Sequence, residues 1–170
     1  MMSQLRSVQV AEVLATIGDQ TGLKSLINFI DDWNASSMPV SKIREQETKE
    51  DAAWRIATNE KELGLPRNME KPRYLGHVKL NQKSERFQEV TEYNYHVFHL
   101  ALSADMADFF KGKEGFQWVT WPQLTGVEYS PDITLSPTVG PCIVQAYFER
   151  CARRPAYAVV AITVLDQINL

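Results

Sequence analysis

The sequence predicts an α/β (α+β) fold in which a mixed sheet lies between helical layers. Residues 93–102 place apolar or aromatic side chains on both faces of a strand, which is typical of a strand covered on both sides. Residues 7–17 show a similar mixture. A long helix at 49–63 and a second near 137–152 would each cover one face, so we predict an α/β/α sandwich.

The segment 48–63 carries the start and stop signals of an amphipathic helix. Thr48 is the predicted N-cap, and the acidic residues Glu50 and Asp51 favour the first turn. Gly64 and then Pro66 are expected to end the helix. Its buried side would consist of Ala52, Ala53, Ile56, Ala57 and Leu63.

The later part of the chain predicts a short exposed helix and an additional strand. Residues 104–115 contain several acids and lie between two strand-like runs, so we expect a short solvated helix there. After Pro155 the β-branched run in 156–170 favours a strand. This segment is too apolar to remain in water. We predict that it folds back as an edge strand, or that it pairs with a second copy or another protein.

Composition limits the classes of function. At 170 residues, with 44% hydrophobic and 23% charged residues, the chain predicts one globular domain. A net charge of −3 without a basic run argues against generic nucleic-acid binding. Cys142 and Cys151 would lie about 13 Å apart along one helix, too far for a disulfide. With no signal peptide and no transmembrane-length apolar run, we expect a cytoplasmic protein that is not bound to a membrane.

One stretch carries a recognisable spacing, and it runs from residue 39 to 65: PVSKIREQETKEDAAWRIATNEKELGL. Five residues separate Ser41 from Glu47, and seven separate Glu47 from Arg55. This resembles the Nudix box, a loop–helix–loop that binds metal and a diphosphate in Nudix hydrolases. The family pattern is Gly, five residues, Glu, seven residues, then Arg-Glu-apolar-x-Glu-Glu-x-Gly-apolar, and Ser41 stands in place of its glycine. The resemblance implies a Nudix-type α/β/α sandwich in which Arg55 pairs with Glu47.

The resemblance extends over most of the chain and divides it into a Nudix-like domain, 1–155, and the additional segment 156–170. Residues 7–17 and 23–30 look like the paired strands that open such a domain. Residues 74–80 and 93–102 look like its central strands, and 116–121 resembles its late strand. Residues 136–152 resemble its closing helix.

The carboxylates that follow the box arginine are mostly replaced. In the family they stand at offsets of one, four and five, which share one face of a helix. Here those positions hold Ile56, Asn59 and Glu60. If the family glycine corresponds instead to Gly64, they hold Thr58, Lys61 and Glu62. One carboxylate of three survives in either register, although Glu45, Glu47 and Glu50 could compensate from the loop.

Two functional hypotheses from different classes follow. In the first, a Nudix-like domain with an impaired metal site binds a nucleotide diphosphate derivative, or a protein partner, in a regulatory or assembly role and needs no cofactor. In the second, an atypical Nudix pyrophosphohydrolase uses Mg²⁺ or Mn²⁺, with Glu60 or Glu62 as metal ligands and with Glu47 and Arg55 in the catalytic site. Ligand-binding candidates are Trp33, Lys42 and Glu114. A purely structural protein that interacts through 156–170 is a third possibility.

Overall fold

The main path of the sheet runs β3–β2–β1–β6–β5, in a computed structural model that describes residues 5–19, 22–83, 88–125 and 128–143. Its strands are β1 (Arg6–Asp19), β2 (Gly22–Ile30), β3 (Ala35–Ser37), β5 (Arg73–Lys83) and β6 (Val90–Leu102). β1 and β6 are parallel, whereas β1–β2, β2–β3 and β5–β6 are antiparallel. The mixed sheet of the predicted sandwich is therefore confirmed. The predicted strands 7–17, 23–30, 74–80 and 93–102 lie within a few residues of β1, β2, β5 and β6, whereas β3 was not predicted.

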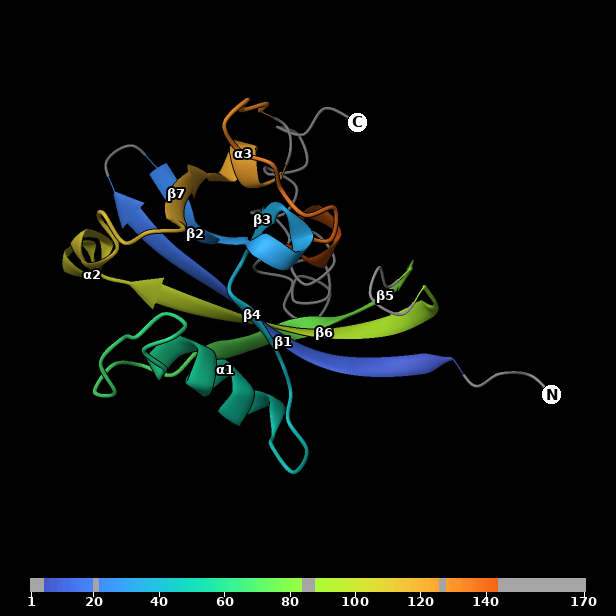
Figure 1. Cartoon of the computed structure of the whole chain (residues 1–170). Helices are drawn as coiled ribbons and strands as arrows, with labels where there is room; N and C mark the ends of the chain where they lie inside the picture. Colours follow the sequence, from blue (N-terminus) through green and yellow to red (C-terminus); the bar gives the residue numbers. More distant parts are fainter. Residues whose placement is uncertain (1–4, 20–21, 84–87, 126–127, 144–170) are drawn as a thin grey trace, which may run out of the picture.

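The long strand β1 changes partner along one edge. Its residues 10–12 pair with β4 (Val40–Lys42), whereas its residues 16–19 pair with β2. β7 (Phe116–Thr120) continues outward from β2. Figure 1 shows β2 and β7 on one side of the crossing β1 and β6 strands, and α1 on the other.

Helix α1 (Lys49–Thr58) covers one face of the sheet. It begins as predicted, because the Thr48 hydroxyl accepts a hydrogen bond from the backbone N–H of Asp51 at 3.1 Å. Its apolar side is buried against β1 and β6, which excludes water from both elements. The buried residues of α1 are Ala52, Ala53, Ile56 and Ala57.

The predicted helix 48–63 is too long, because α1 ends at Thr58. Asn59 caps the end with an extended backbone, and its side-chain oxygen accepts from the N–H of Lys61 at 2.9 Å. The chain then folds back over the helix end, where Leu63 and Leu65 donate to the carbonyls of Ile56 and Ala57. Local side-chain bonding and captured carbonyls therefore replace further helical turns.

The opposite face packs under α3 (Trp121–Leu124) and the chain that follows it. Thr120 and Gln123 form a capping box that starts α3. Residues 139–143 are helical, in agreement with the start of the predicted helix 136–152. The residues buried on this face include Leu14, Ile27, Met38, Val97, Val139, Cys142 and Ile143.

Other predictions meet the structure only in part. α2 (Ala104–Phe109) has no buried residue, which fits the expected short exposed helix. The rest of the closing helix, the thiol of Cys151 and the tail 156–170 lie outside the described residues. None of the helices in the described ranges combines the length and apolarity needed to cross a bilayer.

Candidate functional site

The guanidinium group of Arg55 organises the loop–helix–loop that resembles the Nudix box. Its Nε and Nη2 donate to the two carboxylate oxygens of Glu47 at 2.7 and 2.9 Å. Nη1 donates to the Ser41 hydroxyl at 2.9 Å and to Glu62 Oε1 at 3.2 Å. Nη2 also donates to the carbonyl of Lys42 at 3.0 Å. One side chain on α1 thus fastens the segments on both sides of the helix, and the implied Arg55–Glu47 pair is present.

The two carboxylates bound by Arg55 differ in their surroundings. The hydrogen bond from Arg55 lowers the pKa of Glu47 to about 2, and the Arg44 backbone N–H assists it. Burial raises the pKa of Glu62, although the charge of Arg55 opposes this shift. Glu47 is therefore a firmly ionised structural group, while Glu62 is the more easily protonated member of the set.

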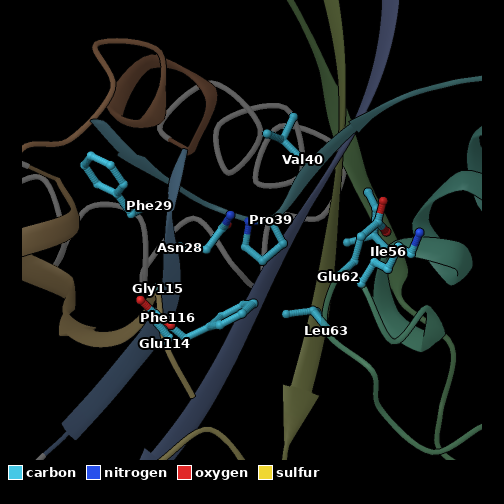
Figure 2. A pocket seen from close by; sticks show the side chains of 11 residues that line it. Asn28, Phe29, Pro39, Val40, Ile56, Glu62, Leu63, Glu114, Gly115 and Phe116 are labelled. Carbon is cyan, nitrogen blue, oxygen red and sulfur yellow. The ribbon is translucent and has the colours of Figure 1, made fainter. Parts of the chain in front are cut away.

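A cavity of about 230 Å³ lies beside this network, between the end of α1 and the β2–β7 pair. Figure 2 shows side chains reaching it from both walls, with Ile56 and Glu62 on the α1 side and Asn28 and Phe116 on the strand side. Pockets that enclose a whole small molecule measure roughly 300–1,000 Å³, so this cavity fits part of a larger ligand. The lining residues are Asn28, Phe29, Pro39, Val40, Ile56, Lys61, Glu62, Leu63, Glu114, Gly115 and Phe116.

The lining combines aromatic surface with polar atoms that lack partners. Asn28 Oδ1 and Glu62 Oε2 are buried and accept no hydrogen bond within the described residues. Phe116 is half-buried and pairs with Asn28 across β2 and β7, so both side chains project from the same face of the sheet. Phe29 follows Asn28 on β2, so its ring points to the opposite face, where Ile27 is buried. Buried oxygens without donors favour a ligand that supplies N–H or O–H groups.

The structure brings some of the predicted site residues together and leaves others apart. Glu62 and Glu114 line the same cavity, whereas Glu47 and Arg55 lie behind it in the ionic network. Glu60 is exposed and lies outside the lining, as do Trp33 on the 3-10 helix η1 (Asp31–Trp33) and Lys42 on β4. Neither register of the box accounts for the lining alone, since it includes Ile56 from the first and Lys61 and Glu62 from the second.

Among the described residues, the acidic side chains near α1 do not gather into a cluster of the box type. Across the described ranges, no three His, Cys, Asp or Glu side chains lie close enough together to hold a metal ion. Both carboxylate oxygens of Glu47 accept hydrogen bonds from Arg55, and the buried Ile56 occupies the first carboxylate position in the register counted from Arg55. These donors do not fit a hexacoordinate Mg²⁺ site formed by clustered carboxylates.

Sequence reasoning missed the strand side of the cavity. Asn28 and Phe29 lie on a predicted strand, and Phe116 begins another, so a strand pattern gave no reason to single them out. One signal was available: the polar residue Asn28 stands at the same strand parity as Leu26, which is fully buried.

Comparison with solved structures identifies the architecture. No protein-family model and no curated protein matches the sequence. A mutT/nudix family protein from Listeria innocua superposes with a TM-score of 0.61 at 9% identity, over 88% of this chain and 97% of that one. NrtR from Shewanella oneidensis, complexed with a 27mer DNA, gives a TM-score of 0.59 at 14% identity over 83% of this chain, which spans 61% of NrtR. The Nudix domain of NrtR, complexed with ADP ribose, gives a TM-score of 0.53 at 14% identity, over 88% and 90% of the two chains. The chain therefore has the Nudix fold.

Proposed function

We propose that this chain is a Nudix-like domain that binds a nucleotide diphosphate derivative without hydrolysing it, in a regulatory or assembly role. One observation carries the proposal: in the register counted from Arg55, the first carboxylate position of the box-like segment holds Ile56, which lines the cavity. In support, the cavity admits part of a nucleotide, and the described residues beside it include no cluster of donors that would neutralise a phosphoanhydride during cleavage.

The lining favours recognition of a nucleobase portion over a bare phosphate. The cavity presents two carboxylates, Glu62 and Glu114, against one cation, Lys61. Carboxylates repel phosphate oxygens, but they accept hydrogen bonds from the amino groups of a base. The ring of Phe116 offers a stacking partner, and stacking is worth about 1–3 kcal/mol per base in other proteins. The NrtR domain that shares this fold was solved with ADP ribose, so ADP-ribose is the first probe.

The proposal is tested by calorimetric titration of the whole chain with ADP-ribose, in EDTA and in excess Mg²⁺. We expect saturable binding of similar affinity in both buffers, and no release of AMP. Replacement of a wall side chain, Phe116→Ala or Asn28→Ala, should weaken binding about tenfold. Tyr129→Ala is the matched control, because Tyr129 is 85% exposed and lies outside the cavity lining.

Binding that requires Mg²⁺, or hydrolysis of ADP-ribose that disappears in Glu62→Gln, would overturn the non-catalytic reading. Absence of binding by ADP-ribose and by dinucleotides such as NAD would overturn the assignment of a nucleotide ligand.

The alternative function, an active atypical pyrophosphohydrolase, is favoured by a different observation. Glu62 and Glu114 line one cavity from opposite walls, and Glu62 Oε2 has no hydrogen-bond partner among the described residues. Such an oxygen is available to a Mg²⁺ or Mn²⁺ ion that arrives with the substrate. In that case both Glu62→Gln and Glu114→Gln should abolish AMP release while ADP-ribose still binds.

A further inference from the structure

The side chain of Lys113 connects the two walls of the cavity without lining it. Its ammonium group donates to the carbonyl of Leu63 at 3.1 Å and lies 3.4 Å from the carbonyl of Glu62. Leu63 and Glu62 belong to the wall that follows α1, whereas Lys113 itself belongs to the segment that leads into β7. The two segments are about fifty residues apart in the sequence, so no local structure holds them together.

Aromatic rings enclose the ammonium group on its other side. Lys113 Nζ lies 5.0 Å from the ring centre of Phe116, 5.4 Å from Phe109 and 5.6 Å from Phe110. A half-buried ammonium is attracted both to the faces of such rings and to carbonyl oxygens. These contacts fix the position of a side chain that would otherwise sample many rotamers.

The residues next to Lys113 form the strand-side wall of the cavity. Glu114, Gly115 and Phe116 all line it. Their backbone is fixed to β2, since the Phe29 N–H donates to the carbonyl of Gly115 at 2.8 Å. The opposite wall is fixed to α1, because the N–H groups of Gly64 and Leu65 donate to the carbonyls of Asn59 and Ala57. Lys113 thus links two walls, one fixed to β2 and the other fixed to α1.

We propose that Lys113 is a positioning residue, which holds the Glu62–Leu63 wall and the Glu114–Phe116 wall at the separation that a ligand requires. The ligand part of this inference rests on the proposed nucleotide-binding function. Loss of the ammonium group removes the attraction between the walls without substituting any residue that lines the cavity. The cavity then opens, and both backbone anchors exchange with solvent more readily.

Amide hydrogen exchange of the whole chain tests the wall contact without any ligand. In Lys113→Met, exchange at Gly64, Leu65 and Phe29 should accelerate about tenfold while amides shared by β1 and β6 keep their rates. Lys113→Arg should restore slow exchange, since a guanidinium can donate to the same carbonyls. Lys111→Met is the matched control, because Lys111 is exposed and bonds to Asp108 at 2.8 Å.

The proposal is overturned if exchange at Gly64 and Leu65 is unchanged in Lys113→Met, or if Lys111→Met accelerates it equally. Acceleration spread evenly over β1 and β6 also overturns it, since Lys113 would then be a general stabilising residue.

ADP-ribose affinity is the second readout. It should fall about tenfold in Lys113→Met and stay within about twofold of the unmodified chain in Lys113→Arg. A chain that binds no ADP-ribose at all would contradict the proposed function, and the exchange data would still decide the role of Lys113.

Discussion

The pKa values of two carboxyl groups, Glu47 and Glu12, are shifted in opposite directions for different physical reasons. Glu47 lies on the α1 side, where Arg55 donates to both of its oxygens and lowers its pKa to about 2. Glu12 lies on the other face, fully buried, and burial raises its pKa to about 8. The side chains of Cys142 and Ser37 lower this pKa only in part, since neither Glu12 oxygen has a hydrogen bond of good geometry.

The comparison teaches which factor decides the charge of a carboxyl group in this fold. A guanidinium partner in two-point contact outweighs the cost of desolvation at Glu47. A hydroxyl and a thiol do not outweigh it at Glu12. The face with the box-like segment is therefore held by an ion pair, while the opposite face contains a neutral acid at physiological pH.

The largest expected effect is on the paired side, from removal of Arg55. Arg55→Met leaves the carboxylates of Glu47 and Glu62 without their cation, and a broken, mostly buried ion pair costs about 3–4 kcal/mol. Arg55→Lys should recover about half of this loss, because an ammonium cannot make the two-point contact. The measurement is the free energy of unfolding in urea.

Arg73→Met is the control for this variant, since Arg73 is exposed and its ion pair with Glu70 spans 3.8 Å. It should change stability by less than about 0.5 kcal/mol. A loss below about 1 kcal/mol in Arg55→Met would show that the network is not a main support of the fold.

The second expected effect is a pH dependence that originates at Glu12. The unfolded carboxyl ionises near its ordinary pKa of 4.5, while the folded one stays protonated up to about 8. In that window the unfolded state binds fewer protons, so stability falls as the pH rises and then levels off above about pH 8. The total loss is about 2–3 kcal/mol once relaxation around the buried group is allowed for.

Urea unfolding across this pH range checks the prediction with two variants. Glu12→Gln and Glu12→Met carry no ionisable group, so the stability difference from the unmodified chain should increase in their favour from about pH 5 to pH 8. A difference that stays constant with pH would contradict the assignment of this dependence to Glu12.

The sequence alone predicted the Arg55–Glu47 ion pair better than it predicted the buried carboxyl group of Glu12. The spacing from Ser41 through Glu47 to Arg55 implied the paired side, because the resemblance carries the ion pair with it. Glu12 was not singled out, although it stands between Val10 and Leu14 on one face of a strand. An acid at that parity is the signal for a buried carboxyl group.

The cavity depends on contacts that no local pattern contains. Helical periodicity placed Leu63 on the buried side of a helix, and Leu63 is buried, but on a turn that folds back after Thr58. The strand wall includes Asn28 and Phe116, which pair across β2 and β7 and line one cavity with Ile56, although the three residues lie far apart in the sequence. The pairing of distant strands and the hydrogen bonds from Lys113 are tertiary contacts. The sequence therefore predicted the helix and the strands, but it did not predict the cavity between them.

The smallest expected effect is a change in the pKa of Glu12 when its neighbour Cys142 is replaced. The thiol lowers the pKa of Glu12, so Cys142→Ala should raise that pKa further and extend the fall in stability beyond pH 8. Cys142→Ser keeps a hydrogen-bond donor and should keep the level region near its original pH. Because Cys142→Ala removes the sulfur and leaves a small cavity, it should also lower the free energy of unfolding by about 1 kcal/mol at every pH.

Burial raises the pKa of the Cys142 thiol above its ordinary value of 9.0, which the unfolded thiol keeps. The stabilities of the variants are therefore compared below pH 9, where the thiol is protonated in both states. Urea unfolding of the two variants supplies the measurement. If the fall in stability ends at the same pH in Cys142→Ala as in the unmodified chain, the thiol has no influence on Glu12. Desolvation alone would then set the ionisation of the unpaired side, and the contrast with Glu47 would reduce to the presence or absence of Arg55.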